Sequence, residues 1–434
     1  MAVSRRDFCD GVNRRTALQA GFSSLLGISL PGLLQLQAAS GARGRRTSLI
    51  FVEMAGGPTQ FETYDPKPDA PAEYRGEFQP IGTSIPGIHF SEWMPEQAKI
   101  AGQLCVIRSI HHGHNSHDPS SHLSQTGYYK TGPKGGPNQY PCIGSVIARV
   151  RGPNRASLPA YVAVPSAMRN GRAAYLGQAC NPFETSADPN SDTFEVPNLQ
   201  LTKNVSIDRL NDRRKLLTTL DARRELRDLE GATTAVDDFS QQAFDLVYGS
   251  RAREAFNISS EPDKLRDRYG RDTVGQSMLL ARRLVEAGVT CVTVRSTGWD
   301  DHNKIAEGLA KHAPPFDRGV ATLIQDLADR GMQDDVLVVA MGEFGRTPRV
   351  NNNAGRDHWG SVMSVMLAGG GLQPGIIGSS NSKGEVPADK PYRPEHVLAM
   401  AYRHLGIDTS MTFLDHSGRP QYLLEDRQLI SELL

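Results

Sequence analysis

Val336-Leu337-Val338-Val339-Ala340-Met341-Gly342-Glu343-Phe344-Gly345-Arg346-Thr347-Pro348 is the stretch that decides the fold. Its first six residues are apolar, which predicts a buried strand, and the polar residues after Gly342 predict a loop at the strand's carboxyl end. A second apolar run, Val289–Ser296, likewise leads into Trp299-Asp300-Asp301-His302. Ligand sites in open α/β sheets form at the carboxyl ends of parallel strands. We therefore expect these two loops to share one edge of a sheet.

Acidic and imidazole side chains collect in these loops. Asp300 and His302 follow one strand, Glu343 follows the other, and His358 lies farther along in Gly355-Arg356-Asp357-His358-Trp359-Gly360. Carboxylate and imidazole ligands suit a hard or borderline divalent cation. The sequence therefore predicts one or two metal ions (Zn, Ca, Mg or Mn) held by these residues. Each residue taken alone is also an ordinary loop or cap residue, which is the alternative.

A histidine-dense loop is a further source of ligands. Leu104–Ser109 reads as a strand, and the loop after it contains five of the twelve histidines: His111, His112, His114, His117 and His122. Such density is typical of metal binding or proton chemistry, with a solvated loop as the alternative. We expect His117 to join the metal site.

The first predicted strand, Ser48–Met54, ends in the turn Ala55-Gly56-Gly57-Pro58-Thr59. Glycines there let backbone N–H groups approach an anion closely. Thr59 then stands where the nucleophile of a hydrolase would; a plain Gly-Pro turn is an equal alternative. Arg346 and Arg356 suit an anionic substrate, because a guanidinium binds phosphate or sulfate bidentately.

Alternation of strand and helix patterns in the second half predicts an α/β fold, with a mostly parallel central sheet and helices on both faces. We expect this domain to span residues 43–434, with residues 171–268 as a mainly helical insertion or cap. The other expected elements are helices Pro141–Arg151, Ile207–Glu230, Val236–Tyr248, Val274–Ala287, Phe316–Arg330 and Pro394–Leu405, and strands Ala160–Val164 and Ser361–Ala368.

Residues 1–42 are expected to be a twin-arginine signal segment. Ser4-Arg5-Arg6-Asp7-Phe8 has the paired-arginine pattern, Asn13-Arg14-Arg15-Thr16 offers a second pair, and a weakly apolar stretch, Ala17–Leu36, follows. That stretch is too polar to predict a stable membrane span. We expect export by the twin-arginine machinery to the periplasm or the extracellular space; an amphipathic N-terminal helix is the alternative.

Charge and cysteine content exclude some classes of protein. The chain has 48 basic and 48 acidic residues, and no basic tract interleaved with aromatic residues, so no nucleic-acid partner is expected. The five cysteines show no C-x-x-C spacing, so a cysteine zinc site is not expected.

With these pieces located, the chain resembles a family known only as domain of unknown function 1501, which is grouped with the alkaline phosphatase and sulfatase superfamily. The matching motifs are Gly56-Gly57-Pro58, Asp65-Pro66-Lys67-Pro68, Tyr269-Gly270, Leu280–Gly288, Trp299–His302, Gly342–Pro348, Gly355–Trp359 and Ala368–Gly371. The resemblance implies an alkaline phosphatase-like α/β sandwich around a metal-dependent esterase site. It also implies that Asp300, His302 and His358 are metal ligands.

The chain departs from that superfamily in two places. The first strand does not end in the usual Asp, and Cys180-Asn181-Pro182-Phe183-Glu184 has Glu184 where formylglycine sulfatases have an Arg. The expected function is an exported metal-dependent hydrolase of phosphate or sulfate esters, with an anionic ester such as a sulfated glycan as substrate. The alternative is a catalytically inert exported protein that binds anionic glycans or other anionic ligands.

Overall fold

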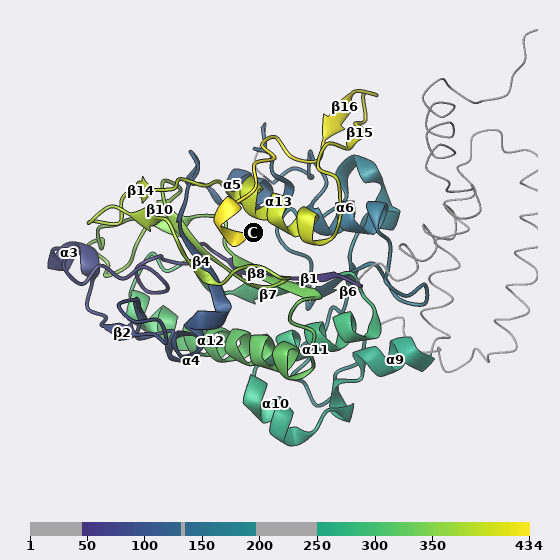
Figure 1. Ribbon diagram of the computed structural model, residues 1–434, viewed down its shortest axis with the longest axis horizontal. Coiled ribbons are helices and arrows are strands. Elements are labelled where there is room, and N and C mark those ends of the chain that lie inside the picture. The colour runs from purple at the N-terminus through teal and green to yellow at the C-terminus, as the bar shows by residue number, and fades with distance from the viewer. Residues whose placement is uncertain (1–45, 132–134, 197–249) are drawn as a thin grey trace, which may run out of the picture. The chain divides into compact units, whose positions relative to one another are not determined.

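The computed structural model describes residues 46–131, 135–196 and 250–434, and Thr47–Leu434 form one compact unit. The expected signal segment and the two helices expected between residues 207 and 248 lie outside the described residues. The core of the described part is an eight-stranded sheet with the strand order β12-β4-β11-β8-β1-β7-β5-β6 (Figure 1). In that order the strands are Gly375–Ile377, Leu104–Ile110, Met363–Gly369, Val336–Met341, Ser48–Ala55, Cys291–Thr297, Tyr161–Val164 and Phe183–Glu184.

The directions of the strands determine which strand ends lie at the same edge of the sheet. β1 is parallel to both its neighbours, with Val52 opposite Val294 of β7 and Ala340 of β8. β5 is parallel to β7 and β6, and β12 is parallel to β4. β11 is antiparallel to β8 and to β4, so β4 runs in the same direction as β1. The mostly parallel sheet is confirmed, and the carboxyl ends of β1, β4, β7 and β8 share an edge with the amino end of β11.

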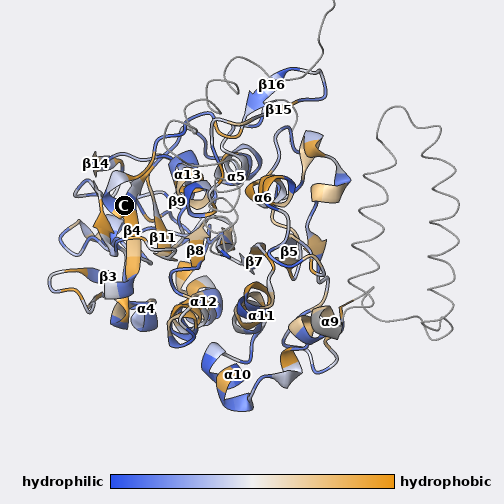
Figure 2. Ribbon diagram, turned by 45° about the vertical axis from the view of Figure 1, so that its right-hand side comes forward, coloured by the Kyte–Doolittle hydropathy of each residue, from blue (hydrophilic) through white to orange (hydrophobic). Residues whose placement is uncertain are grey.

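Helices cover both faces of the sheet, as the sequence predicted. In Figures 1 and 2, α5, α6 and α13 lie on one side and α4, α11 and α12 on the other. The helices are α3 Ala72–Arg75, α4 Pro95–Lys99, α5 His117–Thr126, α6 Ile143–Val150, α9 Ser250–Phe256, α10 Asp263–Tyr269, α11 Thr273–Ala287, α12 Ile305–Asp329 and α13 Pro394–His404.

The apolar run of the first strand reflects burial on both faces. Ile50 and Val52 pack in the core on the α11 and α12 side, while Leu49 and Phe51 pack in the core on the α13 side. Alternate residues of a strand point to opposite faces, so a strand covered by helices on both sides has no polar face. Its neighbour β8 is buried at every position for the same reason.

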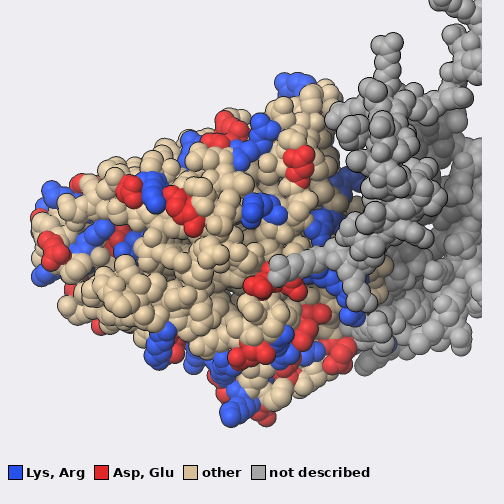
Figure 3. All heavy atoms as spheres, in the orientation of Figure 1, with Lys and Arg blue, Asp and Glu red and all other residues tan. Residues whose placement is uncertain are grey.

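Small elements surround the sheet and complete the unit. Short strands form pairs outside the main sheet: β2 Pro80–Gly82 with β3 His89–Ser91, β9 Gly345–Arg346 with β10 His358–Trp359, β13 Ser379–Ser380 with β14 Pro387–Asp389, and β15 Thr412–Leu414 with β16 Pro420–Tyr422. Acidic and basic side chains are intermixed on the face that Figure 3 shows. Across the described ranges, no helix combines the length and the apolar character that a membrane crossing requires.

Some elements differ from the sequence-based expectation: His117 and His122, expected in a loop, lie in helix α5. Helix α12 begins at Ile305, not near Phe316, and runs through Pro314 and Pro315. Proline inside a helix removes a backbone donor, which is why the sequence suggested a later start. The buried positions Ile305, Leu309 and Ala313 continue the apolar stripe across the prolines, and this packing outweighs the lost bond.

The range 171–268 was expected to be mainly helical. Its described residues hold helices α9 and α10, the short 3-10 helices Ala174–Leu176, Gln178–Cys180 and Ile258–Ser260, and strand β6. Strand β6 pairs with β5, with Phe183 opposite Val162, so part of this range completes the main sheet.

Candidate metal centre

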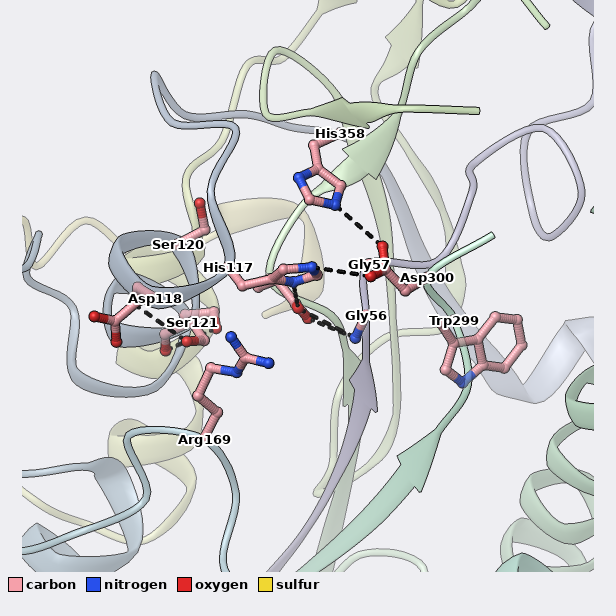
Figure 4. A network of polar contacts seen from close by, with 12 residues as sticks. Gly56, Gly57, His117, Asp118, Ser120, Ser121, Arg169, Trp299, Asp300 and His358 are labelled. Carbon is pink, nitrogen blue, oxygen red and sulfur yellow. Dashed lines mark hydrogen bonds and ion pairs between the residues drawn. The ribbon is translucent and has the colours of Figure 1, made fainter. Parts of the chain in front are cut away.

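The carboxyl edge of the sheet brings together residues from five distant parts of the chain. Asp300 follows β7, Glu343 follows β8, Gly56 follows β1, and His117 opens α5 beyond the end of β4. His358 lies in β10, just before β11. Because β11 is antiparallel, its amino end lies at the edge where the parallel strands have their carboxyl ends. Figure 4 shows the resulting cluster.

Three imidazoles face one carboxylate. The Nε2 atoms of His302 and His358 each lie 3.1 Å from Oδ1 of Asp300, and His117 Nε2 lies 3.2 Å from Oδ2. The Nε2 atoms of His302 and His358 are 2.9 Å apart. The Asp300 side chain is 45% exposed, so the cluster is open to solvent on one side. His117, Asp300 and His358 offer ligand atoms within 4.8 Å of one another, a spacing that fits one metal ion.

Each imidazole uses its other nitrogen to contact an acceptor. Nδ1 of His117 lies 2.6 Å from Glu343 Oε1, and Nδ1 of His302 lies 2.7 Å from Asp357 Oδ1. His358 Nδ1 lies 3.0 Å from the carbonyl oxygen of Asn115. A histidine that donates Nδ1–H to such an acceptor presents the Nε2 lone pair on its other side, which is the usual arrangement of a metal-ligating histidine.

Glu343 was predicted to be a metal ligand, and the structure places it behind His117. Its carboxylate accepts the backbone N–H of Gly56 at 3.1 and 3.2 Å from its two oxygens, and Oε1 contacts His117 Nδ1. Its side chain is only 4% exposed. The chain itself therefore engages both Glu343 oxygens, and the residue is placed to orient the His117 ring.

The charges in the cluster reinforce one another. Partial burial alone would raise the pKa of Asp300, but contacts with His117, His358 and Arg346 hold that pKa well below its usual range. Contacts with Asp300 and then Glu343 raise the pKa of His117 to about 9. The carboxylates thus stabilise positive charge at His117, where a divalent cation would supply more of it.

Gly56 lets the β1 loop approach the β7 loop. Its φ is +123°, and a Cβ there would lie 2.6 Å from the backbone N of Asp300. Only glycine adopts this conformation readily and leaves space for that contact. The turn predicted to approach an anion thus packs its backbone against Asp300.

Arg346, expected to contact substrate, is 1% exposed and holds these loops together. Its guanidinium donates to the carbonyl oxygens of Gly56, Gly57 and Trp299, and to Asp300 Oδ1 at 2.5 Å. The side chain therefore joins the β1 and β7 loops and places positive charge against Asp300 from the protein interior.

Arg356 and Thr59, the other two predicted catalytic residues, lie in a second buried network. Arg356 is fully buried, and its guanidinium contacts Glu62 at 2.7 Å and three backbone carbonyls. The Thr59 hydroxyl donates to Glu62 Oε2 at 2.5 Å. Over the part of the chain that the structure describes, no hydrogen bond or ion pair joins the side chains of this network to Asp300 or the three histidines.

Sequence reasoning missed one basic residue beside the cluster. Arg169 is exposed, follows the predicted strand β5, and has its backbone N 3.2 Å from Oε1 of the buried Glu53. Figure 4 shows its guanidinium directed toward the side of the cluster formed by His117. Its position beyond the carboxyl end of a predicted parallel strand is the signal that could have identified it.

Three solved structures illustrate the partly similar chain course. The structure titled Ps i-CgsB is 13% identical, covers 83% of this chain and 72% of its own, and has a TM-score of 0.41. The PsFucS1 sulfatase from Pseudoalteromonas sp. is 11% identical, with 86% and 70% coverage and a TM-score of 0.39. The phosphonate monoester hydrolase SpPMH from Silicibacter pomeroyi is 10% identical, with 84% and 74% coverage and a TM-score of 0.32. Likenesses this distant carry no argument about chemistry.

Comparison with curated proteins finds no relative of this chain. A protein-family model matches residues 46–434, which include every described residue of the cluster and of the sheet. That model is described as a protein of unknown function, DUF1501, and the chain belongs to this family.

Proposed function

We propose that this protein is a metal-dependent hydrolase of phosphate or sulfate esters. The observation that carries the proposal is the convergence of three imidazole Nε2 atoms on Asp300, with each Nδ1 engaged by an acceptor. Nδ1 contacts of this kind orient the rings of metal-ligating histidines, and a cation bound at Asp300 would take the place of the proton on His117 Nε2.

The donor set fits a divalent cation. Asp300, His117, His302 and His358 would hold the ion, and a set of imidazole and carboxylate ligands suits zinc or manganese best. When bound, such an ion polarises an ester oxygen and lowers the pKa of a water molecule. Glu343 and Asp357 orient two of the rings through their Nδ1 atoms.

The chain's own charges prepare the site for an anion. Arg346 holds Asp300 in its ionised form from the buried side, so its guanidinium acts on the carboxylate rather than on substrate. Arg169 is exposed, and Figure 4 shows its guanidinium directed toward His117. We assign to Arg169 the bidentate recognition of the phosphate or sulfate group.

One observation favours the alternative of an anion-binding protein without catalysis. The Thr59 hydroxyl, the predicted nucleophile, is buried and donates to Glu62. A hydroxyl held in this way is not placed to attack an ester. Catalysis would then depend on water, and a protein that binds the ester without activating water would be inert.

A direct experiment separates the two functions. The metal content of the natively produced protein is measured, followed by turnover of aryl phosphate and aryl sulfate with Zn²⁺, Mn²⁺, Mg²⁺ or Ca²⁺ added. We expect bound metal, metal-dependent turnover, and a higher KM in Arg169→Gln but not in the control Arg403→Gln on the exposed surface of α13. Absence of turnover, with or without bound metal, would favour the anion-binding function and exclude the hydrolase.

We also propose export by the twin-arginine route to the periplasm or beyond. The paired arginines before a weakly apolar stretch support this, and a folded metalloprotein is a suitable cargo. Lys in place of Arg5, Arg6, Arg14 and Arg15 is expected to retain the protein in the cytoplasm. Unchanged export of that variant would exclude the route.

A further inference from the structure

A groove lined by tyrosines lies at the far end of α5 from the metal centre. His117 is the first residue of α5, and Tyr128 and Tyr129 follow its last residue, with Tyr140 and Tyr175 completing the aromatic lining. Asp415 and Gln421 from the β15–β16 hairpin line the other side. Its volume of ≈ 400 Å³ lies in the range of small-molecule sites. None of the predicted site residues belongs to it.

The tyrosine rings form a rigid surface. Tyr128 and Tyr140 stack with centroids 3.9 Å apart and planes 5° from parallel. Tyr175 meets Tyr140 edge-on at 6.2 Å, and His416 meets Tyr175 at 6.3 Å. All four tyrosines remain partly exposed. Partly exposed rings held in one geometry can bind a ligand at little cost in conformational entropy.

The polar groups of the groove are also held in place. Asp415 accepts from the backbone N–H groups of Ser417 and Arg419, from Arg419 Nε at 3.2 Å and from Gln421 Nε2 at 3.1 Å. The Tyr128 hydroxyl donates to the carbonyl oxygen of Tyr422 at 3.0 Å. Apolar ring surfaces thus alternate with fixed hydrogen-bonding groups. A pyranose ring has the matching pattern, with a C–H face and a rim of hydroxyl groups.

The charged groups at the groove already have partners of opposite charge. Arg419 contacts Asp415. Arg393, whose guanidinium lies 5.7 Å from the Tyr129 centroid, pairs with Glu395 and also interacts with Glu425. A sulfate, a phosphate or an organic cation would therefore gain little from these groups. An uncharged ligand does not depend on them.

We propose that the tyrosine groove binds an uncharged pyranose unit of an oligosaccharide. The helix α5 spans ten residues, or about 15 Å at 1.5 Å per residue, between the metal centre and the groove. A saccharide chain of a few sugars is therefore long enough to span the distance between the groove and the metal centre, around the buried residues of α5. This second step rests on the proposed hydrolase function and defines its substrate as an ester carried on a glycan that also contains unsubstituted sugars.

Calorimetric titration of the full-length protein tests the binding step. The probes are neutral hexasaccharides of glucose, galactose, mannose and xylose, their sulfated counterparts, and tetramethylammonium. We expect at least one neutral hexasaccharide to bind. Tyr175→Ala should weaken its affinity about tenfold, which corresponds to the loss of one ring contact. Tyr175→Phe should retain binding if the ring supplies the contact. Tyr74→Ala, on α3 and outside the groove, is the matched control.

Three results would overturn the proposal: no neutral saccharide binds, a folded Tyr175→Ala binds as well as wild type, or tetramethylammonium competes for the groove. Circular dichroism and thermal melting establish that each variant is folded. Tyr140→Ala provides a second removal of a ring if Tyr175→Ala fails to fold.

A further variant separates this proposal from the hydrolase function. His358→Ala removes a predicted metal ligand and should leave saccharide binding unchanged. If the wild type binds a neutral saccharide but turns over no ester, the groove stands and the hydrolase proposal fails. If ester hydrolysis occurs and no saccharide binds, the groove proposal fails alone.

Discussion

The Nε2 atoms of His302 and His358 lie 2.9 Å apart, and each is 3.1 Å from the same oxygen of Asp300. The two rings come from different loops, and their Nδ1 atoms are engaged by Asp357 and by the carbonyl of Asn115. Two neutral rings oriented in this way would bring their lone pairs together beside an anionic oxygen. A cation between the three atoms removes that repulsion.

Loss of either ring is expected to weaken metal binding. His302→Ala and His358→Ala should each lower the affinity for the metal ion by more than about 100-fold. That loss exceeds the usual effect of removing a residue that only hydrogen-bonds to a metal ligand. The double variant should bind the metal ion no more weakly than the single variant of lower affinity, because the ligands of one ion act as a unit. Metal content and competition with a chelator measure this. His89→Ala on β3 is the control, and additive losses would indicate separate sites.

Glu343→Gln tests whether Glu343 orients His117 or binds metal itself. The amide keeps one oxygen to accept from His117 Nδ1 or Gly56 N–H, but it loses the negative charge. We expect metal affinity to fall by about 10–100-fold, as for other outer partners. A loss as large as that of His358→Ala in the same chelator assay would place Glu343 in direct contact with the ion.

Arg356→Leu is expected to destabilise the fold. The substitution leaves Glu62 as a buried carboxylate without its guanidinium partner, at a cost of about 3–5 kcal/mol. Urea unfolding measures the change, and Arg356→Leu combined with Glu62→Gln should recover part of it. Unchanged stability together with a selective loss of turnover would instead support the predicted contact of Arg356 with substrate.

The buried Glu53 predicts a pH-dependent stability. Burial, followed by repulsion from Glu343, raises its pKa from 4.5 to about 7. The folded protein thus keeps a proton that the unfolded chain releases, so stability present below pH 4.5 is lost as the pH rises to about 7. The slope is at most about 1.4 kcal/mol per pH unit.

Glu53→Gln removes this titration and retains an oxygen to accept from Gln125. Thermal melting in the presence of a chelator should therefore show that the stability of Glu53→Gln, relative to the wild type, increases as the pH rises from 4.5 to about 7. The exposed Glu77→Gln should show no such trend. Parallel pH profiles for wild type and Glu53→Gln would contradict the raised pKa.

Local pattern was enough to predict six of the eight sheet strands, and β6 and β12 were missed. The runs that became β1 and β8 are mostly apolar because both faces of the sheet are covered, and that signal is present in each segment alone. Residues directly after such strands, including Asp300, had to lie at one edge if the strands were parallel. The prediction of His117 as a member of the site came from the density of histidines after the strand that became β4.

Contacts between distant segments decided the rest. The antiparallel direction of β11, which brings His358 to the edge from the amino side, depends on its pairing with β4 and β8. The inward direction of Arg346 depends on the carbonyl oxygen of Gly57, and that of Arg356 depends on the carboxylate of Glu62. Each partner is more than 280 residues away in the sequence. The sequence by itself determined which chemical groups stand at the strand ends, because strand formation and loop position are local. Only the tertiary structure decided which groups meet ligand and which support the loops, because burial of a charged side chain depends on partners that the chain supplies from elsewhere.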